Sequence, residues 1–590
     1  MKKRNKFFVA LAFLGMSAGV TSAQTSGSCG ANLTWELTGT GNNLTLTISG
    51  TGAINSYSAE NTPWYSSRNN ITAIVIENGV TGIGKPMRYD VIGGSHWYGI
   101  FFNCSNLSSL TLPLSSCADA TVLGSLFYSI TYTSGIYSTT PPIPLTGEYT
   151  CQWHQDATYS GIQGFGYYVP RSLVTVNITD NGVIKSNFFR GTNIPQVSMP
   201  LVTGIAQNAF YGCNITTANI PSVTSIGNDA FYGCGNLTSV TMPNVISIGS
   251  NAFYGCNITT ANIPNVTSIG NKAFYRCSSL TTIDAAANNP NYSSDNGVLF
   301  NKNKTTIIQY PTGKTDVSYI IPNTVTTIGN FAFSGCIGLT EVTIPKSVTN
   351  IENGTFSDCS GLTTVNFNAA NTRIFNRVEY PEYPPEDYVS VFSGCMNFTI
   401  LNIGNDVTII PYLAFYGCQI KEVIIPNSVT EIEPMAFYWC GGLTSVTIPK
   451  SVTTIGALAF TNCISLTSVI NKSATPQAIF YYDSYYGYYD VFGIDDECAG
   501  YGFDYNHIYK KATLYVPSSA FEEYIGSYGW SKFYNIQRIE DENSINEVLA
   551  NSARVVGFYG ILGEKLPREP QNGVYIVKYD NGKTEKKLGK

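Results

Sequence analysis

The hydrophobic and polar positions in the middle of the chain repeat with a period of about 22 residues. In the copy LTSVTMPNVISIGSNAFYGC, the apolar residues Leu237, Val240 and Met242 alternate with Ser239 and Thr241. This alternation predicts a short strand with one buried face. The proline that follows ends the strand because it has no N–H group.

A second apolar pair with the spacing V-x-x-I follows the proline, and a segment A-F-x-x-C comes after it. The phenylalanine and the cysteine are three residues apart, which fits one face of a helical or 3₁₀ turn. A glycine often follows the isoleucine, and we expect these glycines to adopt a left-handed turn. They are Gly227, Gly249, Gly270, Gly329 and Gly456.

Ten copies carry both the phenylalanine and the cysteine, and weaker copies surround Phe102 and Phe189. The ten pairs are Phe210/Cys213, Phe231/Cys234, Phe253/Cys256, Phe274/Cys277, Phe333/Cys336, Phe356/Cys359, Phe392/Cys395, Phe415/Cys418, Phe437/Cys440 and Phe460/Cys463. One copy cannot bury its own apolar residues, so we expect the copies to stack into a solenoid with ladders of identical side chains. A period of 22–23 residues is typical of leucine-rich repeats.

The segments L-T-S-V-T-I-P, S-V-T-x-I-G and A-F-x-x-C resemble the repeats of BspA-like bacterial leucine-rich-repeat surface proteins. Residues 27–64 resemble the strand-rich cap that precedes the first repeat in that class. Residues 288–311 resemble its longer, hairpin-bearing repeat, and residues 512–539 resemble its C-terminal cap. The resemblance covers about residues 24–540 and implies a curved, mainly β solenoid with short helical or 3₁₀ turns and terminal caps. It also implies an adhesin-like function.

The two ends of the chain differ from the repeats. Basic residues at 2–6, an apolar run from Phe7 to Val20 and the small residues 21–23 predict a secretory signal peptide. An N-terminal membrane anchor is the alternative, but the run is shorter than the roughly 20 residues that span a bilayer. No later run of 18 apolar residues occurs, so we expect no transmembrane helix in the mature chain.

The last fifty residues contain two alternating segments, 554–566 and 573–588, and the turn signal Asn581-Gly582. An ordinary terminal β-module is one interpretation. The segment also resembles the C-terminal sorting domains of type IX secretion cargo, which implies a small β-sandwich and export across the outer membrane by the secretion machinery.

The predicted organisation therefore has six parts. They are a signal peptide (1–23), an N-terminal β cap (24–90), irregular first repeats with an insertion (91–180), leucine-rich repeats (181–470), a Tyr-rich insertion with a C-terminal cap repeat (471–540) and a secretion sorting domain (541–590).

The fifteen cysteines suggest disulfides in a secreted protein. However, stacked strands place neighbouring Cβ atoms about 4.8 Å apart with parallel directions, whereas a disulfide needs about 3.5–4.5 Å and converging directions. We therefore expect the ten ladder cysteines to be buried free thiols that act as small hydrophobic residues. Five other cysteines lie off the ladder: Cys29, Cys104, Cys117, Cys151 and Cys498. A disulfide between Cys117 and Cys151 is compatible with the sequence.

Composition argues against several functions. Charged residues make up 12% of the chain, about half the usual share, and the net charge of −6 disfavours electrostatic capture of nucleic acid. The chain has only three histidines, and it contains no convergent C-x-x-C pairs and no catalytic motif. We therefore expect no metal site, no cofactor and no enzymatic activity. Carboxylates cluster at Glu386-Asp387 and Asp495–Glu497, where solvated loops are the default interpretation.

Two surfaces remain as candidate binding sites. The first is formed by the polar strand residues that face away from the core, which offer many weak hydrogen bonds to a ligand. Threonine and serine also occur at exposed strand positions simply because they favour the strand conformation, so a structural role is the alternative. The polar strand residues are Thr217, Asn219, Ser239, Thr241, Thr260, Asn262, Asp284, Glu341, Thr343, Asn366, Glu422 and Thr447. The second is the Tyr-rich insertion, whose tyrosines either bind a ligand or cover the solenoid. It contains Tyr482, Tyr485, Tyr486, Tyr488 and Tyr489.

We therefore expect a secreted or cell-surface protein that recognises an extracellular protein or glycan through the solenoid, without nucleic acid as a partner. A structural exoprotein that assembles with itself is the first alternative. A polysaccharide-acting enzyme whose carboxylates lie in an insertion is the second.

Overall fold

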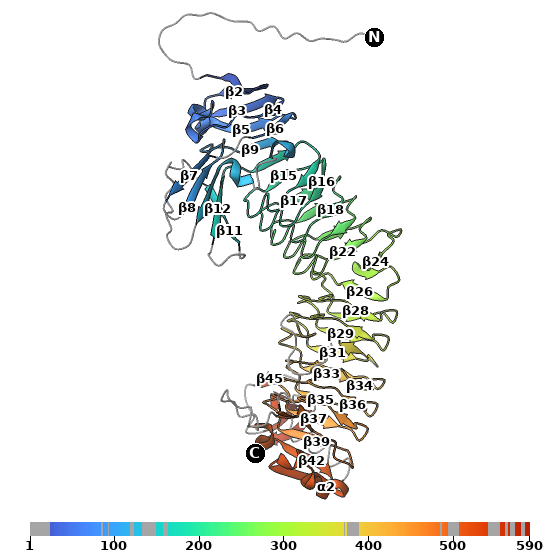
Figure 1. Cartoon of the computed structure of the whole chain (residues 1–590). Helices are drawn as coiled ribbons and strands as arrows, with labels where there is room; N and C mark the ends of the chain where they lie inside the picture. The colour runs from blue at the N-terminus through green and yellow to red at the C-terminus, as the bar shows by residue number, and fades with distance from the viewer. Residues whose placement is uncertain are drawn as a thin grey trace, which may run out of the picture. The chain divides into compact units, whose positions relative to one another are not determined.

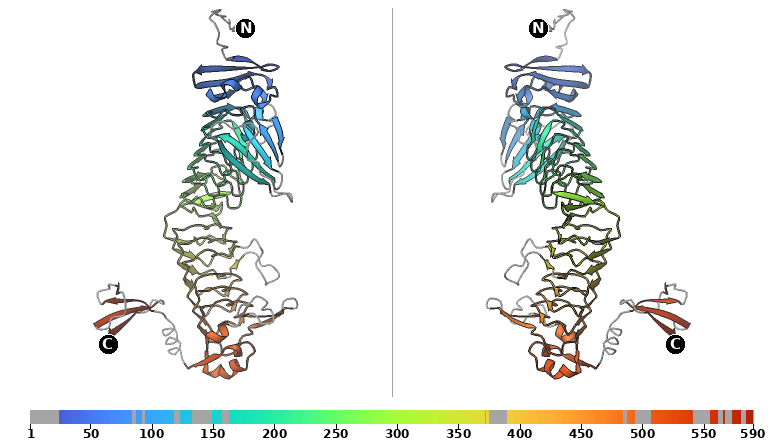
Figure 2. Two further views of the ribbon diagram at one scale, coloured as in Figure 1. Left: turned by 90° about the vertical axis from the view of Figure 1, so that its left-hand side faces the viewer. Right: turned by 90° about the vertical axis from the view of Figure 1, so that its right-hand side faces the viewer.

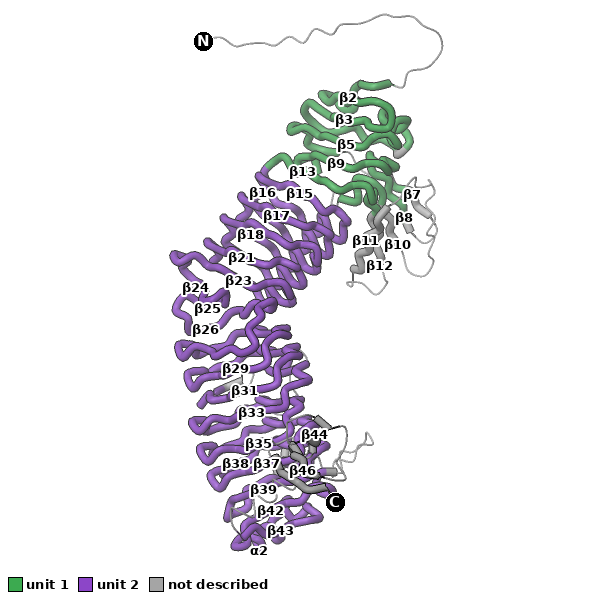
Figure 3. Tube along the Cα trace, turned by 180° about the vertical axis from the view of Figure 1, so that it is seen from behind, with its two compact units in different colours: residues 1–180 green, residues 181–590 purple. Residues whose placement is uncertain are grey.

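The computed structural model describes residues 24–83, 87–91, 94–117, 123–132, 149–156, 163–370, 372–374, 389–483, 487–493 and 507–540. It also describes four strands within the last fifty residues. The chain forms two compact units, residues 1–180 and residues 181–590 (Figure 3). The predicted signal peptide lies outside the described residues.

The first unit begins with three antiparallel strands and continues as a parallel ladder. Its main sheet has the order β1-β2-β3-β5-β9-β13, in which β3 pairs with β5, β5 with β9 and β9 with β13 in parallel. These strands are β1 (Ser26–Gly30), β2 (Leu33–Thr40), β3 (Asn43–Gly50), β5 (Ile71–Ile76), β9 (Ser109–Leu112) and β13 (Thr175–Ile178). The indole rings of Trp35 and Trp64 meet edge to face at 6.2 Å beneath this sheet.

The segment of the first unit that fits the repeat poorly forms a separate antiparallel sheet with the order β11-β12-β10-β8-β7. Its strands are β7 (Met87–Val91), β8 (Gly94–Tyr98), β10 (Tyr128–Tyr132), β11 (Tyr149–Asp156) and β12 (Gln163–Pro170). His96 is buried in this sheet, where its Nδ1 atom hydrogen-bonds the Tyr128 hydroxyl. Burial lowers the pKa of His96, which fits a structural role for this residue.

The second unit is a solenoid of stacked rungs, most of which have two short strands joined by turns, and each strand pairs in parallel with a strand of a neighbouring rung (Figures 1 and 2). The first strands of successive rungs are β15 (Gln196–Ser198), β17 (Thr217–Asn219), β19 (Ser239–Thr241), β21 (Thr260–Asn262), β23 (Thr282–Asp284), β27 (Ser318–Ile320), β29 (Glu341–Ile344), β31 (Thr364–Phe367), β33 (Ile400–Ile403), β35 (Glu422–Ile424), β37 (Ser445–Ile448), β39 (Ser468–Asn471), β42 (Thr513–Pro517) and β43 (Asn535–Ile539). The hydrophobic alternation of the sequence thus appears as one strand per copy.

The second strands form three further sheets. They are β14 (Gly182–Ile184), β16 (Val202–Ile205), β18 (Ser225–Ile226), β20 (Ser247–Ile248) and β22 (Ser268–Ile269); then β26 (Thr306–Gln309), β28 (Thr327–Ile328), β30 (Asn350–Ile351) and β32 (Arg373–Ile374); and then β34 (Ile409–Ile410), β36 (Glu431–Ile432) and β38 (Thr454–Ile455). A hairpin of β24 (Tyr292–Asp295) and β25 (Val298–Asn301) joins the middle sheet.

The C-terminal end of the repeats is covered by two short helices, α1 (His507–Lys511) and α2 (Phe521–Gly526). A hairpin of β40 (Phe480–Asp483) and β41 (Gly487–Asp490) precedes them. The tail contains one antiparallel sheet with the order β45-β44-β46-β47: β44 (Val555–Gly560), β45 (Lys565–Leu566), β46 (Gly573–Tyr579) and β47 (Thr584–Gly589). The β-sandwich expected for this tail stays a prediction.

The phenylalanine rings of successive rungs stack face to face inside the second unit. Their centroids lie 4.8–6.0 Å apart in two runs, Phe189 to Phe274 and Tyr310 to Phe492. Tyr310 and Phe492 occupy positions in this column that the ten sequence markers do not include. All the rings in the column are buried, and a stack of this kind adds ring–ring attraction to the burial of apolar area.

The ten ladder cysteines are buried free thiols, as the sequence predicts. Eight of them donate a hydrogen bond to the carbonyl oxygen of the phenylalanine one rung back, with Sγ–O distances of 2.6–3.3 Å. These eight are Cys213, Cys234, Cys256, Cys277, Cys359, Cys395, Cys440 and Cys463. The same carbonyl also accepts the backbone N–H of the residue three positions further along its own rung. The thiol therefore adds a second donor to each of these buried acceptors.

The purely hydrophobic role that the sequence predicts for the ladder needs correction at these eight cysteines, of which Cys256 and Cys440 are examples. Their Sγ atoms each donate at 3.0 Å, to the carbonyl oxygens of Phe231 and Phe415, so they link one rung to the rung before it. Cys336 differs from them because the rung before it is built around Tyr310. Its Sγ atom lies 4.0 Å from the Tyr310 carbonyl oxygen, so this contact is much weaker. Cys336 and Cys418, whose Sγ atom lies 4.0 Å from the Tyr416 carbonyl oxygen, thus come closest to the hydrophobic role.

The cysteines off the ladder that the structure describes are also free. Cys29, Cys104 and Cys117 are buried thiols in the first unit. The side chain of Cys151 and the whole of Cys498 lie outside the described residues. The Cys117–Cys151 bridge therefore stays a prediction.

The glycines after the V-x-x-I pair do not adopt the left-handed conformation that the sequence predicts; that prediction is wrong. Positive φ occurs instead just before the Ala-Phe pair, as at Asn251 (54°), and just before the cysteine, as at Gly255 (67°). Gly249 is required for a different reason. A Cβ atom there would lie 2.5 Å from the backbone nitrogen of Asn228, so glycine allows neighbouring rungs to approach closely.

Candidate binding face

The outward side chains of β17, β19, β21 and β23 form a regular polar array. Thr217 lies beside Ser239 and Asn219 beside Thr241, and the same register aligns Thr260 with Thr282 and Asn262 with Asp284. We call these eight residues the polar face. All are exposed except Thr282, which is half-buried, and Asp284 carries its single charge.

The side chains of the polar face make no hydrogen bond with any other residue that the structure describes. The threonines that precede the strands behave differently. The hydroxyls of Thr238 and Thr281 donate to the carbonyl oxygens of Thr216 and Thr259 one rung back, at 3.3 and 3.2 Å. The preceding column is therefore occupied within the protein, whereas the polar face has its donors and acceptors available to a ligand.

The side chains at the equivalent positions further along the solenoid form hydrogen bonds with one another. The Asn366 amide donates to Glu341 Oε1 at 2.7 Å and to Thr343 Oγ1 at 3.0 Å, and the Asn402 amide donates to Asn366 Oδ1 at 2.8 Å. Glu341, Thr343 and Asn366 are half-buried. A ligand that bound there would have to replace these contacts, so this stretch is a weaker candidate than the polar face.

The structure separates the remaining predicted residues from the polar face. Glu422 is half-buried on β35, and Thr447 is only 4% exposed on β37. Tyr482, Tyr488 and Tyr489 lie on the β40–β41 hairpin, but their side chains, like Tyr485 and Tyr486 altogether, fall outside the described residues. The Tyr-rich site thus stays a prediction.

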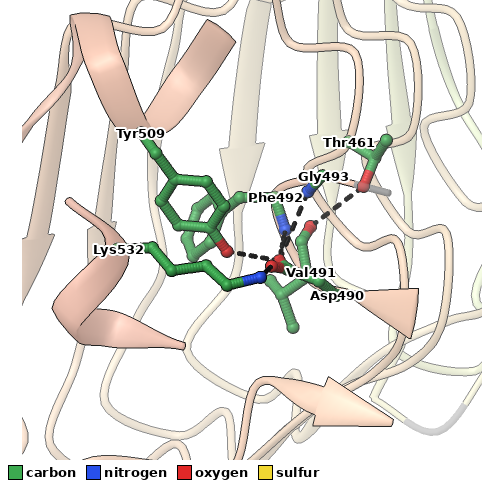
Figure 4. A network of polar contacts seen from close by, with 7 residues as sticks. All are labelled: Thr461, Asp490, Val491, Phe492, Gly493, Tyr509 and Lys532. Carbon is green, nitrogen blue, oxygen red and sulfur yellow. Dashed lines mark hydrogen bonds and ion pairs between the residues drawn. The ribbon is translucent and has the colours of Figure 1, made fainter. Parts of the chain in front are cut away.

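Sequence reasoning overlooked a buried carboxylate at the end of this hairpin. Asp490 Oδ1 accepts hydrogen bonds from the backbone N–H groups of Phe492 (2.7 Å) and Gly493 (3.3 Å) and from the Tyr509 hydroxyl, while Lys532 Nζ lies 3.4 Å from Oδ2 (Figure 4). Burial raises the pKa of Asp490, and its donors oppose this effect. The sequence signal for this buried carboxylate is an acidic residue two positions before a phenylalanine of the stacked column, here Asp490 before Phe492.

The contacts of Asp490 are structural rather than catalytic. Its backbone carbonyl accepts from Leu458 N–H at 2.9 Å, and that of Val491 accepts from Phe460 N–H at 2.9 Å. Phe492 stacks on Phe460 at 5.6 Å. The carboxylate therefore fixes the end of the insertion as one more rung. The carboxylates at 386–387 and 495–497 lie outside the described residues.

Within the described part of the chain, no cluster of three His, Cys, Asp or Glu side chains could hold a metal ion. A search of the same residues finds no helix that is long and apolar enough to cross a membrane.

The repeat geometry agrees with a comparison of the sequence with protein families. The model of the BspA-type leucine-rich repeat region matches residues 161–281, 203–319, 313–378 and 388–484, which together make up more than half of the chain. The chain belongs to the BspA-type leucine-rich repeat family. No curated protein sequence matches it.

Solved structures of other bacterial proteins resemble this BspA-type chain. A leucine-rich cell surface protein of Faecalibacterium prausnitzii has 22% identity and a TM-score of 0.39 over 77% of this chain and 96% of its own. The pneumococcal vaccine antigen PcpA has 17% identity and a TM-score of 0.40 over 87% and 98%. A leucine-rich repeat protein of Bacteroides ovatus has 20% identity and a TM-score of 0.36 over 75% and 93%.

Proposed function

We propose that this BspA-type protein is a secreted or cell-surface recognition protein that binds a neutral, hydroxyl-rich macromolecule through the polar face. The observation that carries the proposal is the row of exposed hydroxyl and amide groups without partners in the described structure. Membership of the BspA-type family and the signal peptide that the sequence predicts support the location.

The chemistry of the polar face favours a glycan over a charged ligand. Seven of its eight side chains are uncharged, so their desolvation costs little compared with that of ionised groups. Each hydrogen bond contributes only about 1 kcal/mol, but strands about 4.8 Å apart repeat the same donors and acceptors along the solenoid. A polymer with repeated hydroxyl groups can engage several rungs at once, and its affinity then rises through multivalency.

A glycan array provides the test. The fragment of residues 24–540 is expected to bind neutral polysaccharides and to show no preference for sulfated or uronic acid polymers. Binding to a matrix protein and to no glycan would contradict the proposed ligand class. Self-association measured by light scattering, without any heterologous ligand, would support the structural alternative and contradict the proposal.

The tail is proposed to direct export through its resemblance to type IX sorting domains, with the secretion machinery as its partner. The antiparallel sheet of β44–β47 is compatible with that role. Deletion of residues 541–590 is expected to leave the protein in the periplasm of its host, as measured by cell fractionation. Unchanged delivery of the truncated protein to the cell surface would contradict this role.

A further inference from the structure

The turns of the second unit are interrupted between β22 and β26. In the three preceding turns, the backbone N–H groups of alternate residues bond the carbonyl oxygens of the next rung at 2.7–3.0 Å. These donors are at positions 208, 210 and 212, then 229, 231 and 233, and then 251, 253 and 255. The equivalent donors of the next turn belong to Lys272, Phe274 and Arg276, and they have no acceptor among the described residues.

The hairpin-bearing repeat explains the interruption. The chain inserts β24 and β25 after β23, so the next turn is built around Tyr310 and lacks the A-F-x-x-C sequence. The two sides stay attached elsewhere: the Gly313 N–H donates to the Leu280 carbonyl at 2.8 Å. Further out, the Tyr275 hydroxyl and the Arg276 guanidinium both reach Asp358 Oδ2 at 3.1 Å. The gap is thus bounded by fixed contacts.

An open cavity of about 390 Å³ occupies this interruption, which is within the size range of ligand pockets. The unpaired turn residues Lys272 and Phe274 line one side, and Gln309, Asn330 and Glu352 are among the residues opposite. Glu352 Oε2 already accepts a hydrogen bond from the Asn330 N–H at 2.9 Å. The cavity therefore presents backbone donors of the kind that the three preceding turns use between rungs.

Lys272 adds a positive charge to the cavity, whose lining also includes Glu352. Its Nζ atom lies 3.9 Å from the centroid of the Phe331 ring, and it has no ion pair within the described residues. Burial and the neighbouring Arg276 lower the pKa of Lys272. Asn251 occupies the position equivalent to Lys272 one rung earlier, and its side-chain amide donates a hydrogen bond to Asp229 Oδ1 of the adjacent rung at 3.1 Å. An acidic side chain in the neighbouring rung thus provides an acceptor at this position.

We propose that this cavity binds an extended peptide with an acidic side chain, which adds itself to the turn of residues 272–276 as a rung. The unpaired N–H groups are two residues apart and have the spacing that bonds main-chain carbonyls in the preceding turns, which is the chemistry of strand addition. The acidic side chain lies beside Lys272 in the column where Asp229 lies beside Asn251. This site is separate from the polar face and does not depend on a glycan ligand.

The chain itself supplies a defined probe. A synthetic peptide with the sequence of residues 225–233 (SIGNDAFYG), acetylated and amidated at its ends, carries the carbonyl groups that the preceding turn pairs with, and it places Asp229 next to Lys272. Binding to the full chain is measured by fluorescence anisotropy, and hydrogen exchange is followed by mass spectrometry. In the free protein, the amides of residues 272–276 are expected to exchange at least about tenfold faster than those of residues 251–255. The probe is expected to slow them.

Two substitutions test the role of charge. Lys272→Asn keeps a residue that tolerates the positive φ of this position, as Asn251 shows, and is expected to weaken probe binding about fivefold through loss of one ion pair. A probe with Asp229→Asn is expected to lose the same amount. The control variant Lys421→Asn, on an exposed site at a different rung, is expected to bind like the unmodified protein.

Three results would overturn the proposal. The first is equal protection of residues 272–276 and 251–255 in the free protein. The second is no binding of the probe at millimolar concentration. The third is binding that neither Lys272→Asn nor the acid-free probe weakens.

Discussion

Alkaline pH is expected to unfold the solenoid well before it ionises the thiols inside the folded chain. Burial raises the pKa of six ladder thiols, that of Cys277 to about 12; they are Cys213, Cys234, Cys277, Cys359, Cys418 and Cys463. In the unfolded chain the same groups ionise near pH 8.5. Because the folded pKa is raised, the stabilisation is complete below about pH 8.5 and is lost as the pH rises.

The expected size of this effect is large. Each thiol costs up to about 1.4 kcal/mol of stability for every pH unit above its unfolded pKa. Six thiols together would lower the free energy of unfolding by roughly 10 kcal/mol between pH 8 and pH 10, which is comparable with the whole stability of a typical domain. Urea unfolding followed by circular dichroism at several pH values measures it.

A single substitution provides the control for the alkaline effect. Cys277→Ala removes one ionising group, so the loss of stability between pH 8 and pH 10 should be smaller by about 2 kcal/mol than in the unmodified protein. Stability that stays constant up to pH 10 would show that the ladder thiols are either oxidised or in contact with solvent.

Removal of one ring from the phenylalanine column is expected to be the most damaging single change in the repeats. Phe253 is fully buried between Phe231 at 5.3 Å and Phe274 at 5.6 Å. Phe253→Ala would leave a cavity that the neighbouring rungs cannot close, because the backbone hydrogen bonds between rungs fix their spacing. We expect a loss of about 3–5 kcal/mol in the free energy of unfolding, measured by urea denaturation.

The adjacent residue is the matched control for Phe253. Tyr254 also stacks on its neighbours, with ring centroids 4.3 Å from Tyr232 and 5.0 Å from Tyr275, but it is half-buried at the surface. Tyr254→Ala should therefore cost about 1 kcal/mol, because part of its ring stays accessible to water in the folded state and its loss leaves no closed cavity. Equal losses for the two variants would mean that the column is not the core of the solenoid.

The repeat pattern predicted the stacked strands because each copy places apolar residues at the same positions, and stacking is the one arrangement that buries them all. The interruptions were harder to predict. Tyr310 and Phe492 enter the phenylalanine column without the Ala and Cys neighbours that mark the other copies. Their membership depends on hairpins that return the chain to the column, and no local pattern records where a hairpin returns.

The cysteine ladder shows the same limit of a local pattern. Cys256, Cys336 and Cys440 occupy the same place in the A-F-x-x-C segment. Only Cys256 and Cys440 reach a phenylalanine carbonyl at 3.0 Å, whereas Cys336 follows the rung built around Tyr310 and stays 4.0 Å from its carbonyl. The acceptor belongs to the neighbouring rung, so the hydrogen bond of each thiol cannot be inferred from its own copy.

The turn chemistry was partly misread for a related reason. Glycine after the V-x-x-I pair suggested a left-handed turn, but its role is to admit the backbone of the neighbouring rung, as at Gly249. The left-handed positions are filled by Asn251 and its equivalents, which include Phe331, Leu413 and Met435. A residue such as Leu413 gives no sign of positive φ in the sequence, because the stacked rungs impose the conformation.

The sequence also could not rank the outward polar positions. Asn262 and Asn366 have the same residue type at the same place in the repeat. Asn262 is exposed without a partner among the described residues, whereas Asn366 bonds Glu341 and Thr343. That difference depends on which side chains the neighbouring rungs carry, so it becomes visible only when the register between rungs is known.

The affinity of two matched variants for a neutral glycan that binds the unmodified protein tests the central claim most directly. One variant carries Asn219→Ala, Thr241→Ala, Thr260→Ala and Asn262→Ala in the polar face; the other carries Thr343→Ala, Thr364→Ala, Asn366→Ala and Asn402→Ala on the later strands. The first is expected to bind at least about a hundredfold more weakly, because it loses four hydrogen bonds, and the second to bind within about threefold of the unmodified protein. Equal affinities of the two variants, or a greater loss in the second, would contradict the assignment of the polar face as the binding surface.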